Sequence, residues 1–287
     1  MSSILDCRPL RKKIEAELIA TISRITHEYK ENLTTVIIQV GNRADSTAFI
    51  IAKKKLAEKL GVAIRHIKFP EVVSEKELLE AVQAVAADSH VHGIIVQLPL
   101  PSHIDKDRII NAIPAHKDID GLTAINIQRT WEARTSAIVP ATTRGILTLC
   151  REFGIVLEGK HVVILGRSTL VGKPTAVMCT TQNATVTVCH SKTPNLSDIT
   201  KTADVLIVAI GKPHFITKDY IRAGQTIIDV GITFVDGVMK GDVHPEVIDH
   251  LGNNGSVTPV PFGVGQMTVA SLFQNLVQGF LQSKNLL

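Results

Sequence analysis

Short runs of branched aliphatic residues alternate with helical stretches along most of this chain, and this alternation limits the possible folds more than any other feature. The runs that we predict as strands are residues 35–40, 64–69, 93–98, 161–165, 185–189, 205–209 and 226–230. Continuous Val/Ile runs are typical of parallel strands buried on both faces, and strands separated by helices form parallel sheets with right-handed crossovers. An aromatic content of only 4% agrees with a core of aliphatic side chains. The chain is therefore predicted to be an α/β protein.

The length of 287 residues suggests two domains, since a typical domain has roughly 150 residues. A turn-rich section that includes Pro114 and Gly121 follows the third strand, and no repeat or low-complexity linker marks a sharper boundary. We place the boundary near residue 140, so that residues 1–140 and 141–265 form two α/β domains. The last helical stretch, within residues 266–287, is expected to pack back on the first domain.

Composition excludes several classes of protein. The chain is 45% hydrophobic and 20% charged, which indicates a substantial core and not a disordered chain. No apolar stretch approaches the roughly 20 residues of a membrane span, and residues 1–8 lack the apolar core of a signal peptide. The net charge of +4 is dispersed and there is a single Trp, so neither a membrane nor a nucleic acid is an expected partner.

The cysteines indicate the redox environment of the chain. They are Cys7, Cys150, Cys179 and Cys189. No two of them form a C-x-x-C motif, which argues against a zinc site or a disulfide framework and for reduced thiols in a cytoplasm. We therefore expect a cytoplasmic protein without a metal site.

One lysine of the run Lys53-Lys54-Lys55 stands where a lysine is unexpected. On a helical wheel of about 100° per residue starting at Ser46, Lys53 lies at about 340°, within an apolar arc, whereas Lys55 lies at about 180°. A charge on a buried face costs free energy unless it is paired or its pKa falls, and a lowered pKa suits proton transfer. The alternative is a lysine whose stem lies along the apolar face and whose ammonium reaches the rim of the sheet, and geometry alone favours that alternative.

Polar residues follow the third predicted strand. Gln97 closes this apolar strand just before Pro99, at the edge where open α/β sheets bind their ligands. Further on, Asp118-Ile119-Asp120-Gly121 is typical of a turn, in which aspartates by default cap backbone groups. From the residues alone, this default is the preferred interpretation of both aspartates.

A glycine-containing segment, residues 166–174, directly follows the strand at 161–165. Glycines between a strand and a helix let backbone N–H groups and the helix dipole bind phosphate. The segment is not G-x-G-x-x-G and is weak on its own, but the next strand leads to Ser191, where Rossmann proteins read the ribose 2′ position. No acidic residue stands there, and Arg167 and Ser191 can both donate to a 2′-phosphate, which favours NADP. The alternative for Arg167 is a solvated turn residue.

Several segments together resemble the bifunctional methylenetetrahydrofolate dehydrogenase/cyclohydrolase family over nearly the whole chain. They are Ser46-x-x-Phe49-x-x-x-Lys53, residues 93–101, 117–121, 166–174, 189–193 and 229–232, Gly241-Asp242-Val243, and Thr258-Pro259-Val260-Pro261. No single piece is specific, but the set in this order is. The resemblance implies an amino-terminal catalytic, folate-binding domain and a Rossmann-type NADP-binding domain, with a cleft between them, in a homodimer.

The resemblance also implies roles for individual residues. Lys53 would assist the cyclohydrolase step by proton transfer or by polarising water, Gln97 would tune that lysine, and Asp120 would hold the amidine edge of the pterin. The ring at Phe49 would stack on the aminobenzoate of the substrate. Further substrate-binding positions are Ser46, Leu98, Pro99, Pro261, Phe262 and Gly263. The cofactor-binding positions are Gly166, Arg167, Ser168, Ser191, Gly231, Ile232 and Thr142.

The chain departs from the usual family pattern at a few positions. Phe49 stands where the family usually has Tyr, so that stacking survives and the hydroxyl is lost. Phe262 stands where the family usually has Gly beside the cofactor, which adds bulk and disfavours a positive φ. Residues 126–130 and 140–143 also differ from the usual motifs.

We therefore expect an enzyme that oxidises 5,10-methylenetetrahydrofolate with NADP⁺ and hydrolyses the methenyl product to 10-formyltetrahydrofolate. One alternative is a monofunctional dehydrogenase whose cyclohydrolase step is impaired by the missing tyrosine hydroxyl. Another is a catalytically silent protein that still binds folate or dinucleotide. Lys53, Gln97 and Asp120 argue against the silent protein, whereas Phe262 argues for it.

Overall fold

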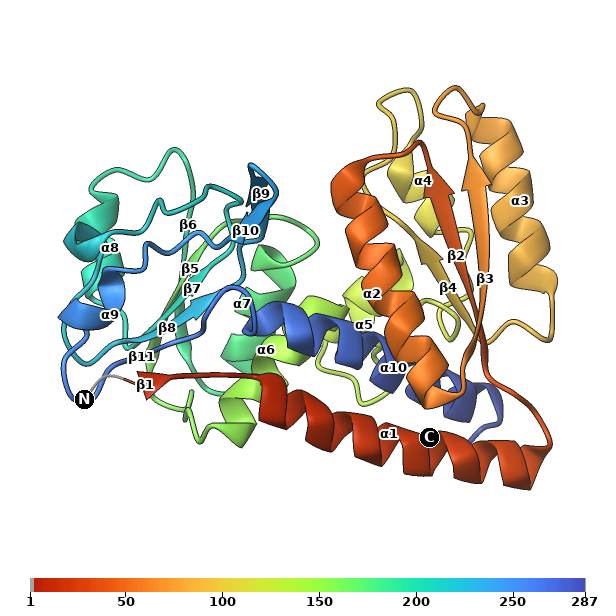
Figure 1. Ribbon diagram of the computed structural model, residues 1–287, viewed down its shortest axis with the longest axis horizontal. Coiled ribbons are helices and arrows are strands. Elements are labelled where there is room, and N and C mark those ends of the chain that lie inside the picture. Colours follow the sequence, from red (N-terminus) through yellow and green to blue (C-terminus); the bar gives the residue numbers. More distant parts are fainter. Residues whose placement is uncertain (1–2, 287) are drawn as a thin grey trace. The chain divides into compact units, whose positions relative to one another are not determined.

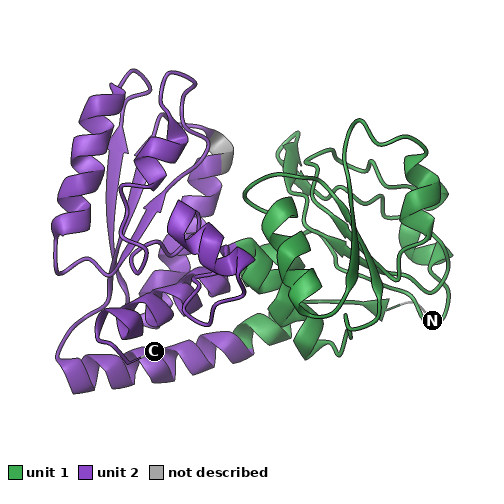
Figure 2. Cartoon of the chain, turned by 180° about the vertical axis from the view of Figure 1, so that it is seen from behind, with its two compact units in different colours: residues 1–12, 142–268 green, residues 13–141, 269–287 purple. Residues whose placement is uncertain are grey.

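The structure, a computed structural model, describes residues 3–286, and for residues 44 and 45 only the backbone. Met1, Ser2 and Leu287 lie outside this part. The first two belong to residues 1–8, which lack the apolar core of a signal peptide. The chain forms two compact units, unit 1 of residues 1–12 and 142–268 and unit 2 of residues 13–141 and 269–287 (Figure 2). The helices α1 (Arg8–Tyr29) and α10 (Val264–Ser283) each contribute residues to both units.

Unit 2 is built on a three-stranded parallel sheet in the order β3-β2-β4. Besides parts of α1 and α10, its elements are β2 (Thr34–Val40), α2 (Ala44–Leu60), β3 (Ala63–Phe69), α3 (Glu75–Ala87), β4 (Gly93–Val96), α4 (Lys106–Ile110) and α5 (Ala124–Trp131). The helices α2 and α3 flank the sheet on opposite sides (Figure 1). Each therefore turns one apolar face toward the strands.

Alternation along β2 explains how the sheet is buried on both faces. Val36, Ile38 and Val40 pack in one cluster with residues of α3 such as Leu78 and Val82. Successive side chains of a strand point to opposite faces, so the residues between them face the side of α2. Both faces are therefore closed to water, as the continuous apolar run predicts.

Local signals define the helix ends of unit 2. The Ser74 hydroxyl accepts a hydrogen bond from the N–H of Glu77 at 3.2 Å, which caps α3 as its sequence predicts. At the carboxyl end of α2, Gly61 adopts a φ of 72°, and its N–H donates to carbonyls of the last turn of that helix. These caps fix where α2 ends and α3 begins.

Unit 1 contains a six-stranded parallel sheet in the order β1-β11-β8-β7-β5-β6, with a separate antiparallel pair of β9 and β10. Besides parts of α1 and α10, its elements are β1 (Ser3–Ile4), α6 (Ala141–Glu152), β5 (His161–Leu165), α7 (Gly172–Thr181), β6 (Thr185–Cys189), α8 (Leu196–Lys201), β7 (Val205–Val208), the 3₁₀ helix η1 (Lys218–Tyr220), β8 (Thr226–Asp229), β9 (Thr233–Val235), β10 (Val238–Lys240), α9 (Val247–His250) and β11 (Ser256–Val257). The predicted α/β class with a Rossmann-type sheet is confirmed.

The strand order of unit 1 places a ligand site by topology. The chain runs from β5 outward to β6 on one side and then returns to β7 on the other side of β5. In doubly wound sheets, ligands bind at the carboxyl ends of the strands where the order reverses in this way. The loops after β5, β6 and β7 are therefore the expected walls of a pocket.

Three strands end slightly earlier than predicted. The strand β4 ends at Val96, β7 at Val208 and β8 at Asp229. The residues that follow still donate one hydrogen bond to the neighbouring strand, as Gln97 does to the carbonyl of Ile38 at 2.8 Å. Each ladder thus continues for one N–H while the chain already turns into a loop.

Among the described residues, no helix is both long and apolar enough to cross a bilayer.

Candidate active site and cofactor pocket

Lys53 is the buried lysine of α2. Lys53 is only 7% exposed, whereas Lys54 and Lys55 are both exposed. The Lys53 Nζ donates to Oε1 of Gln97 at 3.0 Å. Gln97 in turn donates from Nε2 to the carbonyl of Leu98 at 3.0 Å, which fixes the amide with its oxygen toward the lysine. The ammonium group therefore reaches the carboxyl edge of the sheet, but it is buried and hydrogen-bonded there and not solvated.

Asp120 supplies the opposite charge at this site. Burial lowers the pKa of Lys53, and the negative charge of Asp120 partly opposes that shift. Burial likewise raises the pKa of Asp120, and the positive charge of Lys53 opposes it. The environment thus disfavours the charged form of both groups, as is common for groups that transfer protons.

The two aspartates of the turn have different tasks. The Asp118 carboxylate accepts hydrogen bonds from the N–H groups of Gly121, Leu122 and Thr123 at 2.8–3.1 Å and from Nδ2 of Asn126 at 2.9 Å. Asp118 is therefore the capping residue that the turn signature predicts. Among the described residues, no donor is bound to the half-buried carboxylate of Asp120, which leaves it open to a ligand.

The other substrate positions predicted for unit 2 surround this pair in the chain. Phe49 lies one helical turn before Lys53 on α2 and is half-buried, and Ser46 is buried at the start of the same helix. Residues four apart on a helix are neighbours on its surface. Leu98 is half-buried and Pro99 is exposed, directly after Gln97. Unit 2 thus carries Lys53, Gln97, Asp120 and a partly exposed aromatic ring.

The loops after β5, β6 and β7 enclose a cavity of about 290 Å³ in unit 1. Its lining residues are Leu165, Gly166, Arg167, Ser168, His190, Ser191, Leu196, Ala209, Ile210, Lys212 and Phe215. Four predicted cofactor residues, Gly166, Arg167, Ser168 and Ser191, are therefore brought to one pocket at the strand-order reversal. The structure places the pocket where the fold predicts it.

The pocket walls suit a dinucleotide phosphate. Gly166 has a φ of 124°, and a Cβ there would lie 2.3 Å from the carbonyl oxygen of Ala209, so only glycine lets the two loops approach. The Ser168 hydroxyl accepts a hydrogen bond from the N–H of Val171 at 3.1 Å, just before α7. Arg167 and Ser191 are exposed, and the Arg167 guanidinium forms no ion pair with a described residue. A guanidinium and a hydroxyl at this place can bind a 2′-phosphate.

Sequence reasoning missed one wall of the pocket. Ala209, Ile210, Lys212 and Phe215 follow β7, and the Lys212 Nζ lies 5.5 Å from the centre of the Phe215 ring. The missed signal was the position of this segment directly after a predicted strand. Ligands of open α/β sheets bind at the carboxyl ends of the strands, and this rule indicates the segment after β7 as it indicates Gln97.

Three predicted cofactor residues lie outside this lining. Thr142 is on α6 and accepts a hydrogen bond from the Thr268 hydroxyl at 3.5 Å. Gly231 and Ile232 follow β8, where the N–H of Gly231 donates to Oδ1 of Asp229 at 3.0 Å. The predicted substrate residues Pro261, Phe262 and Gly263 also belong to unit 1.

Phe262 occupies a backbone conformation that favours glycine. Its φ is 84°, its side chain is 42% exposed, and the Arg8 guanidinium lies 4.4 Å from the centre of its ring. A side chain at positive φ is strained by contact between its Cβ and the backbone. The family glycine therefore has a conformational reason at this position.

We expect Phe262→Gly to unfold at a higher temperature than Phe262→Ala. Both substitutions remove the ring, but only Gly relieves the strain, so the Gly variant should be more stable by about 0.5–1 kcal/mol after its larger unfolded-state entropy is counted. Thermal or urea unfolding of the two variants measures the difference. An Ala variant at least as stable as the Gly variant would show that the positive φ costs nothing here.

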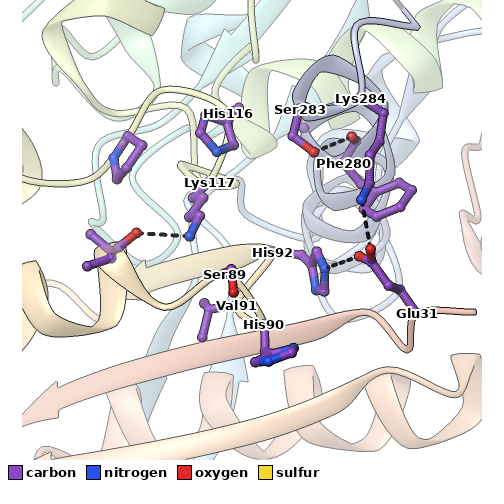
Figure 3. A pocket seen from close by; sticks show the side chains of 14 residues that line it. Glu31, Ser89, His90, Val91, His92, His116, Lys117, Phe280, Ser283 and Lys284 are labelled. Carbon is purple, nitrogen blue, oxygen red and sulfur yellow. Dashed lines mark hydrogen bonds and ion pairs between the residues drawn. The ribbon is translucent and has the colours of Figure 1, made fainter. Parts of the chain in front are cut away.

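Figure 3 shows a second cavity, of about 480 Å³. It is lined by His92, directly before β4, and so lies at the opposite end of this strand from Gln97. Glu31 accepts from Lys284 Nζ at 2.7 Å and from His92 Nε2 at 3.1 Å, and the Lys117 Nζ donates to the carbonyls of Ala86 and Asp88 at 2.9 and 2.8 Å. Glu31 is thus paired with Lys284 and His92, and Lys117 caps the carboxyl end of α3. The cavity therefore has the character of a structural network and not of a reactive site.

Comparison with known proteins adds the following findings. The family model of the tetrahydrofolate dehydrogenase/cyclohydrolase catalytic domain matches residues 5–120, and that of its NAD(P)-binding domain matches residues 140–284. The bifunctional protein FolD of Clostridium novyi is 43% identical over 276 residues, which are 96% of this chain and 98% of that protein. The FolD protein of Streptococcus agalactiae is 40% identical over the full length of both chains.

Solved structures of the same kind share the fold. The crystal structure of the bifunctional enzyme FolD from Campylobacter jejuni has a TM-score of 0.93 and 36% identity and covers all of both chains. The Trypanosoma brucei methylenetetrahydrofolate dehydrogenase-cyclohydrolase, solved with NADP cofactor and an inhibitor, has a TM-score of 0.93 and 34% identity over 99% of this chain and 98% of that one.

Proposed function

Since this chain belongs to the tetrahydrofolate dehydrogenase/cyclohydrolase family, we infer that it oxidises 5,10-methylenetetrahydrofolate with NADP⁺ and hydrolyses the methenyl product to 10-formyltetrahydrofolate. The observation that carries this conclusion is the buried contact between Lys53 and Gln97, with the open carboxylate of Asp120 beside it. A purely structural lysine has no need of such an arrangement. The chain thus acts in the interconversion of one-carbon units carried by tetrahydrofolate.

We propose that Lys53 moves a proton during hydrolysis. Water adds to the methenyl carbon, one C–N bond of the amidinium then opens, and the products are the formyl group and one proton. Burial lowers the pKa of Lys53, which favours the neutral amine, and a neutral amine can accept a proton from the attacking water. Gln97 holds Nζ in place, and its oxygen also accepts a hydrogen bond from the protonated amine.

We assign the binding of substrate to the groups around this lysine. The open carboxylate of Asp120 would accept two N–H groups from the amidine edge of the pterin, and the Phe49 ring would stack on the aminobenzoate. Ser46, Leu98 and Pro99 would line the same region of unit 2. Pro261, Phe262 and Gly263 are the substrate positions assigned within unit 1. Hydride transfer needs mainly the alignment of two bound molecules, so these contacts serve both reactions.

We assign the binding of NADP to the pocket of unit 1. Bound NADP⁺ supplies the hydride acceptor. Arg167 and Ser191 would bind the 2′-phosphate, and Gly166 and Ser168 would approach the remaining phosphates through the backbone. Gly231, Ile232 and Thr142 complete the predicted set.

Two assays on one preparation test the function. Formation of NADPH from methylenetetrahydrofolate reports the dehydrogenase, and loss of the methenyl absorbance reports the cyclohydrolase. We expect both activities. A chain with the first activity alone would be a monofunctional dehydrogenase, and a chain with neither would be the silent binding protein.

Arg167→Ala should weaken the binding of NADP⁺ about ten- to a hundredfold, because it removes a charge-assisted hydrogen bond worth roughly 1.5–3 kcal/mol. The affinity for NAD⁺, which has no 2′-phosphate, should hardly change. A fluorescence titration with each cofactor measures both values. Lys173→Ala is the matched control, since Lys173 is an exposed cation on the neighbouring α7 and does not line the pocket. Equal affinity of the unmodified chain for NAD⁺ and NADP⁺ would refute the assignment.

We further propose that the enzyme is a cytoplasmic homodimer that does not bind nucleic acid. All four cysteines are buried free thiols, which supports a reducing compartment. The dispersed basic charge and the single Trp support a small-molecule substrate over a nucleic acid. Light scattering during size-exclusion chromatography tests the dimer.

A further inference from the structure

Unit 1 buries two aspartates that the proposed chemistry does not use. Asp229, the last residue of β8, is 3% exposed, and Asp242 is fully buried. Among the described residues, neither carboxylate forms an ion pair with a lysine or an arginine. Burial raises the pKa of Asp242 and raises that of Asp229 to about 7. Carboxylates without a cation are costly in a core, so their contacts require an explanation.

Both carboxylates bind backbone N–H groups of loops. Oδ2 of Asp242 accepts from the N–H groups of Ile210 and Gly211 at 2.7 and 3.0 Å. Oδ1 of Asp229 accepts from Gly231 and Asp242 at 3.0 and 3.1 Å, and its Oδ2 accepts from Val243 at 2.9 Å. A continuous path of hydrogen bonds thus joins the end of β8 to the loop after β7.

The backbone around the two carboxylates leaves room for them alone. A Cβ on Gly231 would lie 2.1 Å from Cγ of Asp242, and a Cβ on Gly241 would lie 2.0 Å from Oδ2 of Asp229. Neither distance is possible between non-bonded atoms. The segments Asp229-Val230-Gly231 and Gly241-Asp242-Val243 therefore interlock, and each provides a glycine against the aspartate of the other.

The loop held by Asp242 is a wall of the cofactor pocket. Ala209, Ile210 and Lys212 line it together with Arg167 and Ser191. The segment around Asp242 also binds this loop further along, because His214 donates to the carbonyl of Gly241 and Ile216 to that of Asp242, both at 2.9 Å. Asp242 itself does not line the pocket.

We propose that Asp242 is a positioning residue for cofactor binding, which holds the loop at residues 209–212 in the shape that accepts NADP, and that Asp229 holds Asp242 in place. This proposal rests on the assignment of NADP to the pocket of unit 1. Displacement of a binding wall by about 1 Å costs up to about a hundredfold in function even when the substituted residue is remote.

The unpartnered oxygen of Asp242 allows its charge and its hydrogen bonds to be separated. Oδ1 is buried and has no partner among the described residues, while Oδ2 makes both bonds to the loop. In Asp242→Asn, the amide oxygen can occupy the Oδ2 position and keep both bonds, with the NH₂ group in the place of Oδ1. In Asp242→Ala, both bonds are lost.

Gln225 offers a matched control in the same sheet. It is fully buried, and its Nε2 donates to the carbonyls of Thr200 and Ala203 at 2.7 and 2.9 Å. It thus also holds two backbone groups with one side chain, but directly before β8, at the amino end of the sheet. Gln225→Ala should lower stability without moving the pocket wall.

The experiment measures the Kd for NADP⁺, the KM and kcat of the dehydrogenase, and the unfolding temperature of the full chain and these three variants. We expect Asp242→Ala to weaken NADP⁺ binding roughly ten- to a hundredfold. It should raise the KM for NADP⁺ more than it lowers kcat. Asp242→Asn should stay within about threefold of the unmodified chain. Gln225→Ala should lose thermal stability and keep its affinity.

Two results would overturn the proposal. One is an Asp242→Ala variant that binds NADP⁺ as the unmodified chain does, and the other is a loss of affinity in Gln225→Ala as large as in Asp242→Ala. Should Asp242→Ala not fold, amide hydrogen exchange at Ile210 and Gly211 in Asp242→Asn decides: lost affinity with protected amides contradicts the proposal, and retained affinity with protected amides supports it. Absence of NADP⁺ binding by the unmodified chain would instead refute the proposed function.

Discussion

Lys53→Met is expected to lower the cyclohydrolase rate by about 10²- to 10⁴-fold, the usual contribution of a positioned acid or base. The substitution keeps a long unbranched side chain on the buried face of α2 but removes the amine that Gln97 holds at 3.0 Å. NADP⁺ binding should not change, because the cofactor pocket is built from other residues. Methenyltetrahydrofolate hydrolysis and a cofactor titration on the same variant measure the two effects.

Lys55→Met is the matched control for this prediction. Lys55 is two residues away on the same helix, but it is exposed on the opposite face. Its substitution should leave hydrolysis within about twofold, as is usual for a surface change away from any special feature. Equal losses in the two variants would show that burial does not distinguish Lys53.

The pH dependence of hydrolysis provides a second check on the role of Lys53. Burial lowers the pKa of this amine, so the neutral form is available at lower pH than for an ordinary lysine. Gln97→Glu would place a negative charge beside Nζ, which favours the protonated form and raises the pKa. The acid limb of the hydrolysis profile should therefore move to higher pH by about one unit or more. An unmoved limb would mean that another group controls it.

Phe49→Tyr is expected to raise the ratio of cyclohydrolase to dehydrogenase activity by about 10²-fold. The ring that we propose to stack on the substrate remains, so folate affinity and hydride transfer should hardly change. The new hydroxyl lies one helical turn from Lys53, where it can hold the attacking water or relay a proton. Rates of both reactions at saturating substrate give the ratio.

Phe49→Leu separates the ring from the hydroxyl. It removes the aromatic face and adds no hydroxyl, so folate affinity should fall for both reactions and the ratio should stay as in the unmodified chain. A Phe49→Tyr variant with an unchanged ratio would indicate that Phe262 and the altered segments at 126–130 and 140–143 set the balance between the two activities.

Local patterns of the sequence predicted the layers of the fold. Aliphatic runs predicted the parallel strands β2 to β8 to within one or two residues at their ends, but not the two-residue strands β1 and β11. The wheel separated Lys53 from Lys55. The segment after β5 was also placed correctly beside Ser191 in one pocket. These features depend on periodicity and on neighbours in the chain, which a sequence displays directly.

The same patterns did not distinguish residues with identical local signals. Asp118 and Asp120 stand in one turn, and only the folded loop shows that Asp118 takes the backbone N–H groups while Asp120 is left open. The environment of Lys53 was likewise undecided, because the helix alone allowed its ammonium to be solvated at the rim of the sheet. Its partner Gln97 is 44 positions away in the chain.

The sequence by itself thus determined which segments are strands and helices, which faces they bury, and the family to which they are similar. The tertiary structure alone decided the contacts: Lys53 Nζ donates to Gln97 at 3.0 Å, and the Asp242 carboxylate accepts from the N–H groups of Ile210 and Gly211. It also brought Arg167 into one pocket with the loop after β7. The physical reason is that a hydrophobic period records only which way each side chain points from its own element. The order of strands in a sheet, which brings distant loops to the same edge, is set by packing of whole elements against one another.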